Sequence, residues 1–164
     1  MNTLLKNDLQ GLRVAIYNVK DLPGSKFNYA LLVNDDRLEA EIKKIEASKG
    51  KLSAEATAYL QAKQDITESL ACRDTEGNFI TETLPGGRVI HTFDDQPAFL
   101  VAIKSVDEKH PDEIAEIARI ENDFNDLLNS PADLVFHMIK QTDLPDGITG
   151  AQMKPLMVMI ETNN

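Results

Sequence analysis

The clearest pattern of apolar and polar positions runs from Lys26 to Arg73 and predicts two helices. Apolar side chains recur there in steps of three and four residues, which places them along one face of each helix. The short connection between the helices predicts an antiparallel helical hairpin at the centre of the fold. The apolar positions are Phe27, Leu31, Leu38, Ile42 and Ile45 in the first helix and Ala56, Tyr59, Ile66 and Leu70 in the second.

Three small residues mark the ends of these helices. The hydroxyl groups of Ser25 and Ser53 are placed to accept backbone N–H groups at the two helix starts. Gly50 is expected to end the first helix, because a left-handed backbone conformation costs glycine little.

Each apolar stripe also contains one polar residue, Asn34 in the first helix and Lys63 in the second. One interpretation is a buried polar pair or a site between the helices. The other is that Asn34 fixes the register of packing, while the lysine stem packs and its ammonium group reaches water. We prefer the second interpretation.

The segments on either side of this pair have weaker patterns. Leucines at helical spacing predict a helix from Asp8 to Lys20. A strand over residues 13–19 stays open as an alternative, because three of its residues are β-branched. Residues 2–6 are compatible with a short strand, and a further strand is predicted over residues 134–140.

Two β-prone runs, residues 79–83 and 88–93, predict a β-hairpin that follows a turn at residues 74–78. Pro85 and Gly86 lie between the two runs. They suit a type II turn, because proline fixes the first φ and glycine accepts the positive second φ.

Three more helices are predicted from their first residues. Asp95 opens a short helix, and Pro111 opens a longer one, where its missing N–H group is harmless. Thr149 and Gln152 have the spacing of a capping box for the last helix. Pro155 is expected to kink or split that helix.

Together these elements predict an α+β fold, predominantly helical, in which a small antiparallel sheet packs against the helical hairpin. The sheet is expected to use the β-hairpin and the strand near Phe136. No repeat, low-complexity tract or linker divides the chain, so a single domain over residues 1–164 is predicted.

Composition narrows the classes of function. The net charge of −10 disfavours direct binding to nucleic acid or to an anionic membrane, because phosphate groups would be repelled. A single cysteine excludes an intramolecular disulfide, and no run approaches the roughly 20 apolar residues of a membrane helix. Residues 1–10 lack the pattern of a signal peptide. We therefore expect a protein of a reducing cytoplasm.

The common catalytic and cofactor-binding motifs are absent from the sequence. It contains no phosphate-binding glycine loop, no nucleophile elbow, and no HExxH or CxxC motif. The three histidines are far apart, and we interpret His91 and His137 as strand residues and His110 as a loop residue. We therefore predict no catalytic residue, no metal and no cofactor.

Two smaller features have structural interpretations as well. Cys72 lies near a predicted helix end, without the helix N-terminus or close histidine that activates a thiol. Asp35, Asp36 and Glu39 are close in sequence, but a cation site requires several oxygen ligands from a shaped loop. We interpret these carboxylates as solvated helix surface.

The distribution of charge is uneven. Between Asp107 and Asp133 nine carboxylates are opposed only by Lys109 and Arg119. Such a segment either keeps a helix face solvated or docks to a basic surface, and we prefer the solvated face. If the segment docks, the candidate partner-binding residues are Asp112, Glu113, Glu116, Glu121, Asp123 and Asp126.

Several stretches occur in an order that we associate with one family. They are Leu-Pro-Gly-Ser-Lys-Phe-Asn-Tyr-Ala at 22–30, Asp-Thr-Glu-Gly-Asn at 74–78, Phe-Asn-Asp-Leu-Leu at 124–128, Val-Phe-His-Met-Ile-Lys at 135–140, and Gly-Ile-Thr at 147–149. This order resembles a family of small proteins of unknown function from tailed bacteriophages and prophages. The resemblance implies a phage-encoded protein made in the bacterial host cytoplasm, which works in particle assembly or on a host component. It brings no catalytic residues.

Our leading prediction is a non-enzymatic bacteriophage accessory protein that acts by protein–protein interaction with a phage or host partner. The first alternative is an acidic inhibitor of a host defence or transcription protein, which would imitate nucleic acid. The second is a pocket protein that binds or hydrolyses a small nucleotide, which requires basic residues to converge, for example Arg13, Arg88 and Lys140. The sequence leaves a homo-oligomer open.

Overall fold

The computed structural model describes residues 3–161 and divides the chain into two compact units. Unit 1 comprises residues 1–49 and 123–164, and unit 2 comprises residues 50–122. The fold class is confirmed as α+β and predominantly helical, with a two-stranded antiparallel sheet. Unit 2 is inserted in the sequence of unit 1, and the two are described separately below.

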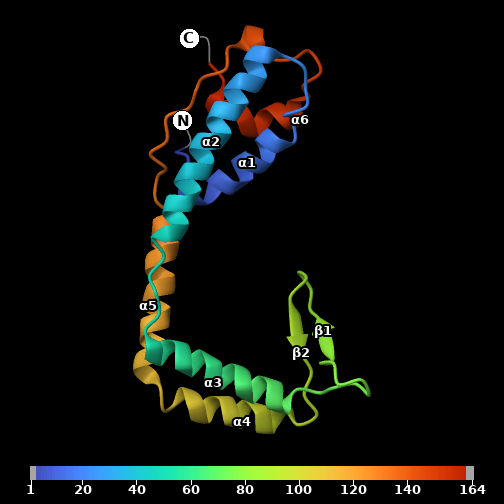
Figure 1. Ribbon diagram of the computed structural model, residues 1–164, viewed down its shortest axis with the longest axis vertical. Helices are drawn as coiled ribbons and strands as arrows, with labels where there is room; N and C mark the ends of the chain where they lie inside the picture. The colour runs from blue at the N-terminus through green and yellow to red at the C-terminus, as the bar shows by residue number, and fades with distance from the viewer. Residues whose placement is uncertain (1–2, 162–164) are drawn as a thin grey trace. The chain divides into compact units, whose positions relative to one another are not determined.

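Unit 1 is built from helices at both ends of its sequence, and Figure 1 shows its two parts in blue and in orange to red. Helix α5, Pro111–Leu128, begins in unit 2, and its residues from Asp123 onward belong to unit 1. The other helical elements of unit 1 are η1 (Lys6–Asp8), α1 (Leu9–Tyr17), α2 (Ser25–Ala47), η2 (Gln141–Asp143), α6 (Gly150–Met153) and η3 (Lys154–Met159).

The core of unit 1 lies where α1, α2 and η3 meet. Fully buried apolar side chains come from all three elements and from the chain before η3. The helix predicted over residues 8–20 is confirmed as η1 and α1, and the alternative strand over residues 13–19 is wrong. The largest fully buried apolar side chains are Leu9, Val19, Phe27, Leu38, Ile139, Leu156 and Met159.

The strand predicted over residues 134–140 is wrong, because this segment runs along α2 in extended form without a neighbouring strand (Figure 1). Side chains of α2 bind its backbone instead. The buried amide of Asn34 accepts from the backbone N–H of His137 at 2.7 Å and donates to the carbonyl of the same residue at 2.9 Å. Arg37 donates to the carbonyl of Val135 at 2.7 Å. Only Ile139 forms a β-bridge, a parallel one to Ile160.

The start of the chain also lacks the short strand predicted over residues 2–6, of which Asn2 lies outside the described residues. Leu5 forms an isolated antiparallel bridge with Pro131, and the backbone N–H of Lys6 donates to the carbonyl of Ser130. This single bridge joins Leu5 to Pro131, and no longer ladder of paired residues extends from it within residues 3–161.

The predicted caps of α2 are wrong at both ends. Gly24, not Ser25, is the N-cap residue, and its φ of +131° is one that residues with a Cβ rarely adopt. The helix ends at Ala47 with Ser48 as C-cap, and Gly50 does not have a left-handed conformation. A Cβ at Gly50 would instead lie 3.2 Å from the Ile120 side chain, so close packing accounts for glycine there.

Unit 2 contains α3 (Ala54–Leu70), β1 (Thr81–Thr83), β2 (Val89–His91), α4 (Gln96–Asp107) and the beginning of α5. The Ser53 N-cap is confirmed, because its hydroxyl accepts from the backbone N–H of Ala56 at 3.0 Å. The predicted caps of the next helices are confirmed too, since Asp95 caps α4 and α5 begins at Pro111.

The predicted hairpin is confirmed, with Glu82 paired to Ile90 at its centre. Its turn has Pro85 and Gly86 in the middle, Gly86 has a φ of +96°, and the N–H of Gly87 donates to the carbonyl of Leu84. This is the expected type II pattern. The sheet has only these two strands among the described residues, so the expected third strand near Phe136 is absent.

Each of the two central helices has a packing partner within its own unit. Helix α2 packs on α1 in unit 1, and α3 packs on α4 in unit 2, where Figure 1 shows the last two side by side. The apolar stripe of each helix is real, and it packs on a neighbouring helix of the same unit. Spacing alone shows which face is apolar, without showing what covers that face.

The end of the chain follows the sequence closely. Thr149 and Gln152 form the predicted capping box at the start of α6. The helix is split as expected, since the four residues of α6 are followed by the 3-10 helix η3, in which Pro155 occupies one of the first positions.

Candidate functional site

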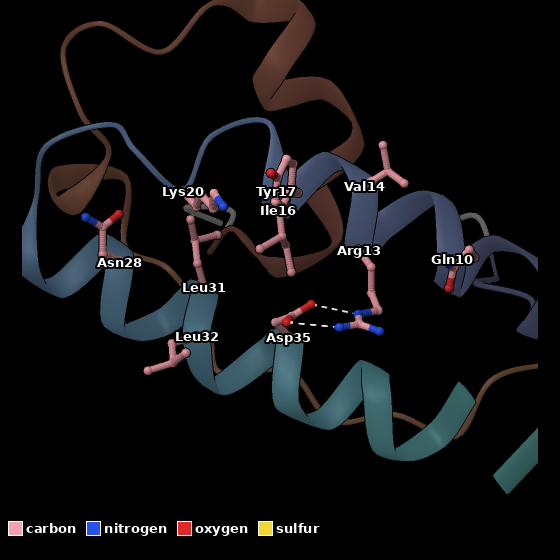
Figure 2. A pocket seen from close by; sticks show the side chains of 10 residues that line it. All are labelled: Gln10, Arg13, Val14, Ile16, Tyr17, Lys20, Asn28, Leu31, Leu32 and Asp35. Carbon is pink, nitrogen blue, oxygen red and sulfur yellow. Dashed lines mark hydrogen bonds and ion pairs between the residues drawn. The ribbon is translucent and has the colours of Figure 1, made fainter. Parts of the chain in front are cut away.

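An elongated groove lies between α1 and α2 in unit 1, and Figure 2 shows the side chains that line it. Its volume is about 530 Å³, which is within the range of ligand-binding pockets. Most of its wall is apolar, and polar groups lie mainly at its ends. The lining residues are Gln10, Arg13, Val14, Ile16, Tyr17, Lys20, Asn28, Leu31, Leu32 and Asp35.

The floor and the rim of the groove differ in burial. Ile16 and Leu31 are buried in the core of unit 1. Val14, Tyr17 and Leu32 stand at the rim, where their exposed fractions are 53%, 66% and 62%. The groove is therefore an open extension of the core, with large apolar side chains presented on both helices.

One end of the groove is closed by an ion-pair network. The Arg13 guanidinium donates to Asp35 at 2.8 Å and to Glu39 at 3.1 Å, and Figure 2 shows its bonds to Asp35 bridging the two helices. The hydrogen bond to Asp35 contributes most to a raised pKa of Arg13. The pKa of Glu39 is lowered, first by its hydrogen bond from Lys43 and then by Arg13. These four charges balance, so this end of the groove is polar and close to neutral.

The other end carries an unbalanced cation. The Lys20 ammonium lies over the Tyr17 ring, 3.7 Å from its centroid. Within residues 3–161 it forms no ion pair with a carboxylate. The Lys20 side chain is exposed, so its charge can pair with an anionic group from outside the chain.

The wall near Asn28 contains a buried acceptor. The Asn28 amide donates to the carbonyl of Leu22 at 3.0 Å, while its own oxygen is buried and has no hydrogen-bond partner among residues 3–161. The amide thereby holds the loop between α1 and α2 against the start of α2.

The candidate acidic residues of α5 are in two different situations. Glu116 accepts from the backbone N–H of Ser53 at 2.8 Å and from its hydroxyl at 2.7 Å, and these bonds, the hydroxyl first, lower the pKa of Glu116. Glu113 lies 3.4 Å from His110. These two carboxylates therefore have structural partners within unit 2, and they are not a freely solvated face.

The remaining four candidates, Asp112, Glu121, Asp123 and Asp126, are exposed, and Asp123 takes part in an interaction of its own. The first two belong to unit 2 and the last two to unit 1. Their role in partner binding stays a prediction.

The polar residues of the two predicted stripes bind within separate units. Asn34 binds the backbone of His137, as described above. Lys63 forms an ion pair of 2.9 Å with Asp107, and Tyr59 donates to the same carboxylate at 2.7 Å. The bonds from Lys63 and then Tyr59 lower the pKa of Asp107. Burial lowers the pKa of Lys63, but the bonds to Asp107 and Tyr59 outweigh it and raise the pKa overall.

The three histidines lie against aromatic rings. His91 lies in β2 against Phe79, as expected for a strand residue. His137 packs against Tyr29, but the segment that contains it is not a strand. His110 is in the loop before α5, beside Tyr59. No group of histidine, cysteine and carboxylate side chains in residues 3–161 has the arrangement of a metal site.

Two further predictions concern the carboxylates of α2 and the nucleotide pocket. Asp35 and Glu39 bind Arg13, so the prediction that they are only solvated surface is wrong. These carboxylates also neutralise Arg13, one of the three basic residues named above as an example for a nucleotide pocket. Lys140 lines a different hollow of unit 1, and Arg88 belongs to unit 2.

The groove itself was not predicted from the sequence. Its signal is nevertheless present, because Val14 and Tyr17 lie three residues apart in α1, off the stripe that carries Leu9, Leu12 and Ile16. When a helix has apolar residues outside its core-facing stripe, the core of the protein does not cover those residues.

Comparisons with known proteins add no relative. No family model matches the chain, and neither the curated proteins nor the solved structures contain a match. None of the helices in residues 3–161 is long and apolar enough to cross a membrane.

Proposed function

We propose that this protein is a non-enzymatic binding protein that acts on another protein, and that the groove between α1 and α2 receives an apolar helix of that partner. The observation that carries the proposal is the exposure of Val14, Tyr17 and Leu32 around one groove that adjoins the core of unit 1. Contiguous apolar surface of this kind marks interaction sites in monomeric proteins.

The openness of the rim favours a protein over a small ligand. Small-molecule pockets bury 70–90% of the ligand surface, which an open groove between two helices does not achieve. An amphipathic helix, by contrast, inserts one row of side chains into such a groove and leaves its polar face in water. The 530 Å³ of the groove accommodates a few apolar anchors of this kind.

The charges at the two ends orient the partner helix. Arg13 is already neutralised by Asp35 and Glu39, whereas Lys20 forms no ion pair with a carboxylate in the described part of the chain. A partner helix with a carboxylate beside Lys20 therefore gains a charge pair, while the other end of the groove accepts a neutral residue.

The proposal includes the setting that the resemblance implies, namely a phage-encoded protein in a bacterial cytoplasm. Its support is the order of the motifs and the presence of a single cysteine, which suits a reducing compartment. The partner is then a phage or host protein.

To test the proposal, the partner is captured from infected cells with the wild-type protein and with two variants. Each variant replaces one exposed apolar residue with glutamate. Leu32→Glu places a carboxylate in the groove, and Val135→Glu places one at an apolar side chain of unit 1 that is 77% exposed and outside the groove. We expect to capture a protein that binds wild type and Val135→Glu but does not bind Leu32→Glu.

The captured protein should then supply a helical peptide that binds the purified chain with the same order of affinities. Equal binding of all three proteins, or a partner lost only when Asp112, Glu121 and Asp126 are reversed to lysine, would contradict the proposed groove.

A further inference from the structure

We infer that residues 134–138 form a docking edge for a short extended segment of another protein, which adds to them as an antiparallel β-strand. This inference does not depend on the groove between α1 and α2, because a different part of unit 1 carries it. Residues 134–138 have the composition of a strand, but no strand lies beside them within residues 3–161.

The side chains of this segment alternate as they do in a β-strand. Leu134 and Phe136 are partly buried against the core of unit 1. Val135 and His137 lie between and after them and are exposed. A period of two residues is that of a pleated strand with one covered face. The segment therefore already has the backbone form that a neighbouring strand requires.

One edge of the segment is paired within unit 1. The carbonyl of Val135 accepts from Arg37, and both backbone groups of His137 bind the Asn34 amide. Ile139 extends this edge through two backbone hydrogen bonds to residues near the end of the described chain. In an extended chain the backbone groups of alternate residues point to the same side, so the odd-numbered residues share this paired edge.

The opposite edge is free. The N–H and carbonyl groups of Leu134, Phe136 and Met138 have no hydrogen-bond partner within residues 3–161. Backbone groups without a partner are rarely buried, so we expect these groups to face water. Figure 1 shows the segment on the side of α2 that faces away from α1. A row of unpaired N–H and C=O groups on an extended chain is a template to which a further strand binds.

The free edge is bounded at both ends. The N–H of Ala132 donates to the carbonyl of Leu4 at 2.9 Å, beside the antiparallel bridge at Leu5. At the other end, the carbonyl of Lys140 accepts a hydrogen bond at 2.9 Å from within η2. A strand that fills the interval in line with residues 4–6 runs antiparallel to residues 134–138, and about five of its residues face the edge.

The shortness of this edge favours a segment of another protein over a second copy of this chain. In the register that pairs all the free residues of two copies, Phe136 lies opposite Phe136 of the second copy. Lys140 of the second copy then lies opposite Ala132, where Leu4 already occupies the edge. A terminal or loop segment without structure on its other side meets no such obstruction.

The side chains along the edge indicate the chemistry of the partner segment. Leu134 and Phe136 are only partly buried, and Met138 has an exposed fraction of 42%, so apolar residues opposite them gain contact area. We therefore expect valine, isoleucine or aromatic residues at alternate positions of the segment. Val135 points to the outer face, where the docked strand leaves it in water, so a carboxylate at this position is compatible with docking.

A display library of random heptapeptides, selected against the full chain, tests the inference. We expect selected peptides with β-branched or aromatic residues at alternate positions. N-methylation of alternate peptide residues in one register should weaken binding about 10-fold or more, and N-methylation in the other register should change it less than about threefold. Only alternate N–H groups of a docked strand face the edge, whereas a helical peptide in the groove would be weakened in both registers.

Two proline variants test the edge from the side of the protein. Met138→Pro removes an N–H group of the free edge and should weaken binding of the selected peptides about 10-fold or more. Val135→Pro is the matched control, because its N–H belongs to the other edge and has no hydrogen-bond partner within residues 3–161. Leu32→Glu in the groove should bind the peptides as wild type does. Circular dichroism checks each fold, and peptide N-methylation decides the outcome if a proline variant does not fold.

Hydrogen exchange of the purified chain tests whether the edge is free. The amides of Leu134, Phe136 and Met138 should exchange rapidly in the chain alone and slowly when a selected peptide is bound. Protection of these amides in the chain alone would overturn the inference.

Other results would overturn the inference as well. One is a library that yields no binding peptide, and another is binding that is equally sensitive to N-methylation in both registers. Equal loss of binding with Val135→Pro and Met138→Pro would also contradict pairing at one edge. A dimer of the purified chain that Met138→Pro abolishes would assign the edge to a second copy, and would equally overturn docking of another protein.

Discussion

The two units keep their structure by different means. In unit 1 a continuous cluster of buried apolar side chains joins α1, α2 and the chain from Ile139 to Ile160. In unit 2, whose residues are all described, only Ala56, Tyr59, Ala71 and Ile120 are buried. Since burial of apolar surface is the main favourable contribution to folding, unit 1 contains most of what stabilises this chain.

Unit 2 depends more on specific polar contacts. Tyr59, Lys63 and Asp107 join α3 to the end of α4, and Ser53 with Glu116 joins the start of α3 to α5. Such contacts fix geometry but contribute little net free energy where they are partly exposed to water. A small unit with so few buried side chains is expected to be only marginally stable by itself.

The largest expected effect is in the core of unit 1. Leu38→Ala removes a fully buried side chain of α2 and leaves a cavity, which should lower the free energy of unfolding by roughly 2–5 kcal/mol. Leu60→Ala in α3, whose side chain is exposed, should cost less than about 1 kcal/mol. Urea denaturation measures both. Equal shifts in the two variants would contradict the difference between the units.

The next effect concerns the contact that replaces a strand in unit 1. Asn34→Ala leaves both backbone groups of His137 without their partner, and this should cost roughly 2 kcal/mol or more. Asn122→Ala, at an exposed position of α5, is the control and should change stability by less than about 0.5 kcal/mol. Hydrogen exchange should show faster exchange at His137 in the first variant only.

A smaller effect is expected in the polar contacts of unit 2. Tyr59→Phe removes the hydroxyl that donates to Asp107 and should cost about 1 kcal/mol. Because Lys63 still pairs with Asp107, the loss should stay below that of Asn34→Ala. A loss as large as that of Leu38→Ala would mean that unit 2 depends on this contact as strongly as unit 1 depends on its core.

The smallest expected effect is a difference between the two units in their response to acid. The pKa values of Asp107 and Glu116 are lowered, so the stability that they provide is complete above the ordinary carboxyl pKa of about 4 and is lost as the pH falls through the lower folded values. Amide NMR spectra recorded from pH 7 to pH 3 should show α3 resonances changing before those of η3, which contains no carboxylate. Asp107→Asn should reduce this difference, and a simultaneous change of both sets of resonances would contradict the prediction.

Local signals in the sequence predicted the secondary structure well. The caps at Ser53, Asp95 and Thr149, the helix start at Pro111 and the turn at Pro85 all depend on residues within four positions of one another. Their chemistry is complete in a short peptide, so it can be read without the fold.

Apart from the N-cap of α2, which is Gly24 and not Ser25, the errors concern partners that are distant in the chain. Residues 134–140 have the composition of a strand, but Asn34 and Arg37 bind their backbone groups from about 100 positions earlier. The groove was missed for the same reason, because Val14 and Leu32 form a surface only when α1 and α2 pack. Glu116 was interpreted as part of an acidic surface, while its partner Ser53 lies 63 positions away.

The insertion of unit 2 into the sequence of unit 1 affects the order of events during synthesis. Asn34 leaves the ribosome 103 residues before His137, its only side-chain hydrogen-bond partner in the described chain. At about 5–20 residues per second, this interval lasts about 5–20 s. During that time the apolar stripe of α2 is without Ile139, Leu156 and Met159, so the nascent chain presents it to solvent and to chaperones. Unit 2, which is contiguous, can meanwhile form its helices α3 and α4 before the residues that complete unit 1 have been made.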